Sequence, residues 1–243
     1  MTHWTDWETV TLIPKLDANR VDVIAVSLDL EPQSLERLER LLSSDELSRA
    51  NRFVYAEHRR RFVACRGVLR SFLGSHLDLD PASINLKTEK HGKPRLADPG
   101  SLDIRFNLTH SRELAVFAFA LSLEVGIDIE EIRQDRDIDE IAARYFSRRE
   151  RSELAAVSPR DGVHAFFRCW TRKEAYLKAR GDGLSVPLDS FDVTVLRDAP
   201  LVLFAQDASR WTMRSIVPEA DFVGAVVYEG ADPAVRTMTY HPA

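Results

Sequence analysis

The feature of the sequence that most constrains the fold is a short alternation at positions 125–130, Val-Gly-Ile-Asp-Ile-Glu. Successive side chains of a β-strand point to opposite faces, so this pattern predicts a strand with one buried face. Asp128 and Glu130 then share the other face with Gly126. Two such carboxylates are either the solvated side of a strand end or ligands for a divalent cation, because hard oxygen donors suit Mg²⁺. A glycine beside them would leave room for the phosphates of a ligand.

The segment 161–180 predicts the strongest helix of the chain, and it places a carboxylate on an apolar stripe. Glu174 falls on the line of core-facing residues, where a charged group is costly unless a partner compensates it. Lys178 lies one turn later, and a salt bridge between the two is one interpretation. The other is a metal ion bound jointly by Glu174 and the two strand carboxylates, which leaves Lys178 to meet phosphates. The apolar stripe consists of Val163, Phe166, Phe167, Trp170 and Leu177.

Three further polar features precede the acidic strand, and each has a structural and a functional interpretation. Lys93 lies in a turn fixed by glycine and proline at 91–94, which is either a surface turn or a phosphate contact. Thr109 and His110 end a strand predicted over 105–110, where they either cap it or bind a phosphate. Arg61 belongs to a basic line on a helix predicted over 57–77, which is either a solvated face or another phosphate contact.

Length, charge and cysteine content limit the class of protein. A chain of 243 residues can bury one large core or two cores of about 120 residues each. A net charge of −5 argues against a nucleic-acid or membrane-surface role. Cys65 and Cys169 sit in apolar helical patterns, which indicates core packing in a reducing compartment. The start lacks an apolar signal core, and the longest apolar run, near 114–123, is shorter than the roughly 20 residues that span a bilayer. We therefore expect a cytoplasmic protein.

The remaining pattern divides the chain into two halves of similar outline. Each half has a strand, then helices, then strands near its end. Ser147 followed by Glu150 is the sequence of a capping box, so we interpret Glu150 as a helix cap. The region 78–103 is rich in glycine and proline and predicts loops. The predicted strands cover 21–30, 105–110, 114–123, 125–130, 191–196, 211–217 and 222–228.

Taken together in this order, the motifs resemble the signature set of the 4′-phosphopantetheinyl transferases. The resemblance covers roughly residues 45–195, and several ordered motifs are more specific than any one of them. The length is similar to the surfactin-type members, which join two similar halves in one chain. The motifs are Gly92–Pro94, Phe106–Ser111, Gly126–Glu130, Phe146–Ser147, Trp170–Lys178, Gly181–Ser185 and Pro187–Phe191.

The resemblance implies a fold and a division of the chain. We expect an α+β protein of two pseudo-symmetric halves, each a small antiparallel sheet packed by helices. The halves should cover residues 1–122, with the coenzyme A phosphate contacts, and 123–243, with the metal site and catalytic helix. The active site should lie in the cleft between them. A chain with both halves needs no partner subunit, so we expect a monomer.

The resemblance also implies an activity and roles for single residues. Members transfer the 4′-phosphopantetheine arm of coenzyme A to a serine of an acyl or peptidyl carrier protein and release adenosine 3′,5′-bisphosphate. Carried over, Asp128, Glu130 and Glu174 would hold Mg²⁺ or Mn²⁺, and Lys178 would stabilise the pyrophosphate. Glu174, or a water held by the metal, would be the base. The predicted coenzyme A contacts are Lys178, Lys93, Thr109, His110 and, by a looser match, Arg61.

Two other functions stay open at this point. A Mg²⁺-dependent pyrophosphate hydrolase acting on coenzyme A or a nucleotide would use the same paired acids without any acceptor. A module would bind coenzyme A without turnover, and the intact acidic trio argues against it. For the transferase, we expect the carrier to dock on residues 131–149, where arginines face an acidic helix of the carrier. These are Arg133, Arg144, Arg148 and Arg149.

Overall fold

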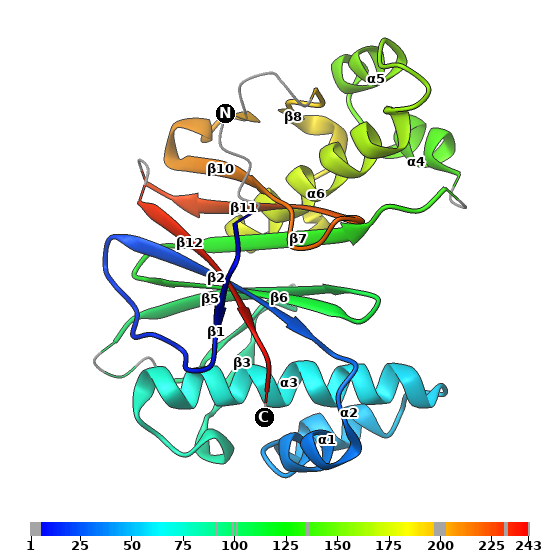
Figure 1. The fold of residues 1–243 in the computed structure, drawn as a ribbon. Helices are drawn as coiled ribbons and strands as arrows, with labels where there is room; N and C mark the ends of the chain where they lie inside the picture. Colours follow the sequence, from blue (N-terminus) through cyan, green and yellow to red (C-terminus); the bar gives the residue numbers. More distant parts are fainter. Residues whose placement is uncertain are drawn as a thin grey trace.

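Two β-sheets lie face to face between two long helices, so the fold has four layers in the order helix, sheet, sheet, helix (Figure 1). The computed structural model describes residues 6–90, 92–98, 100, 102–134, 137–196, 203–230 and 233–242. The helices are α1 (Pro32–Glu39), α2 (Ser44–Ala50), α3 (Ala56–Leu77), α4 (Ile138–Tyr145), α5 (Arg148–Ala155) and α6 (Gly162–Arg180). The strands are β1 (Glu8–Val10), β2 (Arg20–Ser27), β3 (Leu86–Thr88), β4 (Pro94–Leu96), β5 (Ile104–Ser111), β6 (Leu114–Leu121), β7 (Val125–Glu131), β8 (Asp192–Val193), β9 (Leu203–Phe204), β10 (Trp211–Ile216), β11 (Phe222–Glu229) and β12 (Ala234–Tyr240).

The α+β class with a two-half arrangement is confirmed. The first sheet has the strand order β1-β12-β2-β6-β5, and the second has the order β10-β11-β7. The second sheet and the β2-β6-β5 part of the first are antiparallel, as expected. The last strand, β12, returns to the first sheet and runs parallel to both β1 and β2. The first sheet is therefore mixed.

An ion pair explains how β12 is held between two strands from the start of the chain. Asp22 on β2 is 1% exposed and accepts two hydrogen bonds from Arg236 on β12, at 3.0 and 2.7 Å. Arg20 donates to the same carboxylate at 2.9 Å. A shift of β12 along β2 would remove these donors and leave a buried carboxylate unpaired, at a high cost in free energy. The ion pair therefore fixes the register of β12.

Three apolar clusters fill the spaces between the layers. One lies between α3 and the first sheet, one between the two sheets, and one between the second sheet and α6. Val125, Ile127 and Ile129 of β7 belong to the middle cluster, as the alternation predicts. Asp128 and Glu130 therefore lie on the face of β7 toward α6, and the prediction of a shared face is confirmed.

Gly126 has a different purpose from the one that the sequence suggested. A Cβ atom at this position would lie 2.1 Å from the backbone nitrogen of Ala179 and 2.2 Å from the carbonyl oxygen of Ala175. The glycine thus gives room to the backbone of α6 where the helix crosses β7, and not to a ligand's phosphates. The prediction of a phosphate gap at Gly126 is wrong, because strand and helix are in direct contact there.

Several local predictions can be compared with the structure. Ser147 and Glu150 form the expected capping box at the start of α5, and the strands predicted over 105–110 and 114–123 are present as the antiparallel pair β5 and β6. The strand predicted over 191–196 is only two residues long, Asp192–Val193. The loop-rich region holds the short β3–β4 hairpin, which its glycines and prolines obscured. Among the described residues, no helix is long and apolar enough to cross a membrane.

Candidate active site

The edge strands of the two sheets, β5 and β7, are joined by side chains of β5. The Asn107 amide oxygen accepts a hydrogen bond from the backbone N–H of Ile127 at 2.9 Å. The Ser111 hydroxyl accepts from the backbone N–H of Glu131 at 3.1 Å. These residues and Thr109 are two apart along the strand and share one face. These side chains thus connect the two sheets at an edge where β5 and β7 do not pair through their backbones. The bonds to Ile127 and Glu131 lie on either side of Asp128 and fix its position.

Asp128 lies at the centre of a close group with Thr109 and Lys178. Its Oδ1 atom accepts hydrogen bonds from the Lys178 ammonium at 2.6 Å and from the Thr109 hydroxyl at 3.0 Å. The ammonium also lies 3.3 Å from the Thr109 oxygen. Burial raises the pKa of Asp128, while Lys178 and Thr109 act in the opposite direction. The group brings residues of β5, β7 and α6 together, from both halves of the chain.

Glu174 and Glu130 lie within electrostatic reach of this group. Burial raises the pKa of Glu174; Lys178 lowers it, and the negative charges of Asp128 and Glu130 raise it further. The Ser111 hydroxyl donates to Glu130 at 2.9 Å, which orients that carboxylate. Repulsion between neighbouring carboxylates is relieved when one of them takes up a proton or when they bind a cation together. Asp128, Glu130 and Glu174 are therefore suited to either outcome.

A basic side faces the acids. His110, next to Thr109, is close enough to Lys178, Arg61 and His58 for their charges to lower its pKa, after the larger effect of desolvation. Arg61 of α3 forms ion pairs with Glu57 at 2.5 Å and Glu113 at 3.4 Å. Cations of α3 and α6 and the imidazole of His110 on β5 therefore converge on one region, which suits an anionic ligand.

Lys93 is placed apart from this region. Its side chain is buried, and its ammonium donates to the Glu124 carboxylate at 3.2 Å and to the carbonyls of Val125 at 3.0 Å and Ala179 at 3.3 Å. An ammonium has three donors, so these acceptors saturate it. The prediction that Lys93 binds a phosphate is not supported by this geometry. His91, at the start of the same turn, lies outside the described residues.

The three predicted metal ligands can be tested for their fit to a cation. Among the described residues, no group of three or more His, Cys, Asp or Glu side chains is already arranged to hold a metal ion. The Lys178 ammonium supplies the positive charge beside Asp128. The Oδ2 atom of Asp128, however, is buried and has no hydrogen-bond partner among the described residues. An orphaned carboxylate oxygen near two further carboxylates is a donor set that suits Mg²⁺, so the residues fit the ion.

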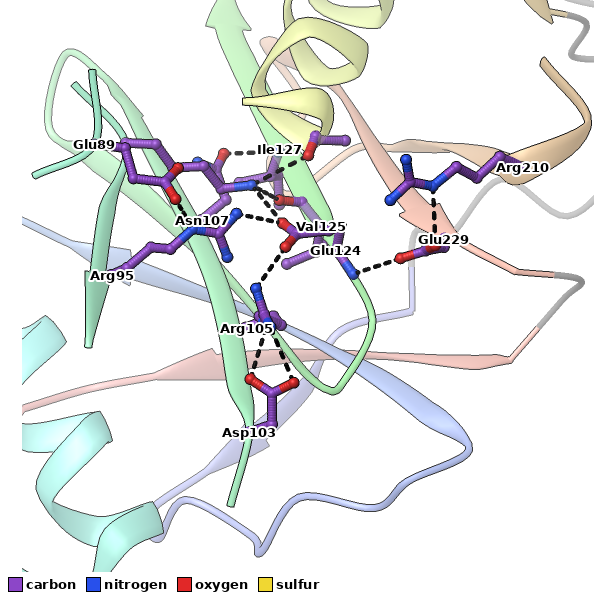
Figure 2. A network of polar contacts seen from close by, with 12 residues as sticks. Glu89, Arg95, Asp103, Arg105, Asn107, Glu124, Val125, Ile127, Arg210 and Glu229 are labelled. Atoms are coloured by element: carbon purple, nitrogen blue, oxygen red, sulfur yellow. Dashed lines mark hydrogen bonds and ion pairs between the residues drawn. The ribbon is translucent and has the colours of Figure 1, made fainter. Parts of the chain in front are cut away.

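Sequence reasoning missed four residues that shape the site. Asn107 and Ser111 share a face of β5 with Thr109, while Phe106 and Leu108 lie on the other face, and this period of two was a usable signal. His58 precedes Arg61 by one turn of α3 and is placed near His110 only by the packing of helix on sheet. Glu124, which binds Lys93, precedes β7 directly and gave no local signal (Figure 2).

Comparison with known families agrees with this geometry. The family model described as "4′-phosphopantetheinyl transferase superfamily" matches residues 124–227, and the model "4′-phosphopantetheinyl transferase, N-terminal" matches residues 30–122. The chain belongs to the 4′-phosphopantetheinyl transferase superfamily. The resemblance drawn from the motifs is thereby confirmed, and the chain is an enzyme of this class.

Two curated relatives are similar over most of the chain. The 4′-phosphopantetheinyl transferase HetI of Nostoc sp. (strain PCC 7120) is 39% identical over 226 residues, which cover 90% of this chain and 94% of the relative. The 4′-phosphopantetheinyl transferase Sfp of Bacillus subtilis (strain 168) is 32% identical over 179 residues, 74% of this chain and 78% of the relative. A solved holo-(acyl-carrier-protein) synthase from Bacillus anthracis is 22% identical with a TM-score of 0.37, over 45% of this chain and 96% of that chain.

Proposed function

We propose that the protein transfers the 4′-phosphopantetheine arm of coenzyme A to a serine of an apo acyl or peptidyl carrier protein. The observation that carries the proposal is the contact of Asp128, Lys178 and Thr109, with Glu174 close by and a basic side opposite. A site with carboxylates on one side and basic side chains on the other suits the diphosphate of coenzyme A. The cations bind the diphosphate oxygens, and a carboxylate beside the attacked phosphorus can act as the base.

The reaction makes one bond and breaks one. The serine oxygen attacks the phosphorus that carries the pantetheine arm, and the bond from that phosphorus to the bridging oxygen of the diphosphate breaks. The serine proton passes to Glu174, the carboxylate of α6 that lies within electrostatic reach of Asp128, Glu130 and Lys178. Adenosine 3′,5′-bisphosphate leaves, and Lys178, His110 and Arg61 stabilise its growing negative charge.

The ion that we propose for this site is Mg²⁺, with Mn²⁺ as a substitute. Asp128, Glu130 and Glu174 would hold it, and the buried Oδ2 atom of Asp128 supports this assignment. When bound, the ion supplies positive charge beside the diphosphate. Removal of divalent ions by a chelator should therefore abolish transfer, and added Mg²⁺ should restore it.

We further propose that the halves 1–122 and 123–243 act together within one polypeptide, with coenzyme A between them. Thr109 of the first half contacts Asp128 and Lys178 of the second, which supports a monomer that needs no partner subunit. A cytoplasmic location is supported by the two buried free thiols, Cys65 and Cys169.

The carrier surface proposed over 131–149 is only partly available to a partner. Arg133 pairs with Glu131 at 3.3 Å, and Arg149 pairs with Glu153 at 2.9 Å. Residues 135 and 136 of this surface lie outside the described residues. Charge reversal of Arg148 and Arg149 together should raise the KM for the carrier. An unchanged KM would move the docking surface elsewhere.

Intact-mass analysis tests the function directly. Candidate apo carriers are incubated with coenzyme A, Mg²⁺ and the enzyme, and a mass gain of one phosphopantetheine arm is the expected result. A parallel reaction without carrier separates transfer from hydrolysis. If coenzyme A is cleaved there while no carrier gains mass, the protein is a hydrolase and the proposal is wrong. Binding of coenzyme A without either reaction would leave a binding module.

A further inference from the structure

A network of charged side chains surrounds Glu124, the residue that directly precedes β7 (Figure 2). One oxygen of its carboxylate accepts from Lys93 at 3.2 Å and from Arg95 at 2.8 Å. The other oxygen accepts from Arg105 at 2.7 Å. Three cations from β4, β5 and the turn before β4 thus share one carboxylate that directly precedes β7.

Among the three, Lys93 links Glu124 to the active site. Its ammonium donates to the carbonyl of Val125, three residues before Asp128, and to the carbonyl of Ala179, one residue after Lys178. The same spot is where β7 and α6 touch backbone to backbone. Lys93 is buried, so its charge there depends on the neighbouring carboxylate.

From this arrangement we propose that Glu124 is a positioning residue for the transfer reaction. It keeps Lys93 charged and in place, and Lys93 holds the start of β7 against the end of α6. That contact sets the distance between the Asp128 carboxylate and the Lys178 ammonium, which is 2.6 Å. Glu124 touches neither of these groups and acts on them through Lys93.

The inference rests on the proposed function, because it assigns Asp128 and Lys178 to the chemical step. It also separates two roles for Lys93. A lysine that binds a phosphate of coenzyme A contributes to substrate affinity. A lysine that fixes the crossing of strand and helix contributes to the geometry of reaction, and a displacement of about 1 Å can cost a large part of the rate.

The test compares Glu124→Gln with a matched variant, Asp103→Asn. Asp103 belongs to the same network and binds Arg105 at 2.7 and 3.0 Å, but it does not contact Lys93. Both substitutions remove one carboxylate charge with little change of shape. Steady-state transfer is measured for both variants and for Lys93→Met. Each rate is divided by the concentration of folded enzyme, which circular dichroism determines. Glu124→Asp replaces Glu124→Gln if that variant does not fold.

We expect kcat of Glu124→Gln to fall about tenfold or more while the KM for coenzyme A changes less than about threefold. Asp103→Asn should keep kcat within about twofold of the wild type, and Lys93→Met should match Glu124→Gln. The double variant at Glu124 and Lys93 should be no slower than either single one, because the two act as a unit. An unchanged kcat in Glu124→Gln overturns the proposal. So does a Lys93→Met effect that appears only in the KM for coenzyme A.

A second measurement separates this proposal from the proposed function. If the wild-type protein transfers nothing, the proposed function fails, and the coupling of Glu124 to Lys93 is then read from guanidinium unfolding. A coupling between the two substitutions in the unfolding midpoints supports the link through Lys93. Independent, additive effects overturn it.

Discussion

The contact between Lys178 and Asp128 allows one prediction to be worked through. Lys178→Met keeps the aliphatic stem and removes the charge 2.6 Å from a carboxylate that is 5% exposed. At an effective dielectric of about 20, Coulomb's law gives a gross attraction of about 6 kcal/mol, before any cost of desolvation. Loss of one partner from a buried pair costs about 3–5 kcal/mol. Since the Lys178 side chain is 29% exposed, solvent screens part of this, and we expect a loss of about 2 kcal/mol.

The assay is a double-mutant cycle on the free energy of unfolding. Wild type, Lys178→Met, Asp128→Asn and the double variant are unfolded with guanidinium chloride at pH 7 in chelator. We expect a coupling free energy of about 2 kcal/mol, because the double variant no longer buries an unpaired charge. The exposed pair Arg149 and Glu153 serves as control, and its coupling should stay below about 0.5 kcal/mol.

Additive effects at Lys178 and Asp128, within about 0.5 kcal/mol, would refute this reasoning. They would mean that solvent or a rearranged side chain replaces the ammonium at no cost. Transfer should be lost in all three variants, because Asp128 and Lys178 both belong to the proposed chemical step.

Three further predictions concern the scaffold. Burial lowers the pKa of His76 to about 4 in the folded protein, against 6.5 for a free histidine. Between these two values the unfolded state is protonated at His76 and the folded state is not, so the free energy of unfolding rises with pH from about 4 to 6.5. His76→Leu should remove about 3 kcal/mol of that rise in denaturant melts, and an unchanged pH profile would contradict it. Gly126→Ala should cost about 3 kcal/mol or more and lower Tm sharply, because its Cβ meets the α6 backbone; a normal Tm would show that strand and helix can separate. Lys173→Met leaves the fully buried Glu150 unpaired and should cost about 3–5 kcal/mol, whereas a loss below about 1 kcal/mol would mean that Glu150 takes up a proton instead.

Single helices and strands could be predicted from the sequence more reliably than the elements with which they pair. The alternation at 125–130 and the apolar stripe of 161–180 depend on neighbours along the chain, and both elements form as predicted. The place of β12 in the first sheet depends on Arg236 meeting Asp22, more than 200 residues away, which no local pattern encodes. The short β3–β4 hairpin carries Lys93 next to its turn, and the ammonium of Lys93 binds Glu124 and the carbonyls of Val125 and Ala179, which are distant in the sequence.

The same division holds for the active site. Asp128, Thr109 and Lys178 come together because a strand edge, a hairpin and a helix each present a recognisable motif. Lys93 sits in an equally recognisable turn, yet its ammonium turns inward to backbone carbonyls and Glu124. A motif fixes where a residue lies in the chain, whereas the direction of its side chain follows from the acceptors that folding brings near.

The measurement that tests the central claim most directly is the intact mass of one carrier treated in parallel with wild-type enzyme and with Glu174→Gln. Glutamine has the shape of the carboxylate but cannot take the serine proton. We expect a gain of one phosphopantetheine arm with the wild type and no gain with a folded Glu174→Gln. Equal gain with both proteins would contradict the assignment of Glu174 and, with it, the site built around Asp128 and Lys178.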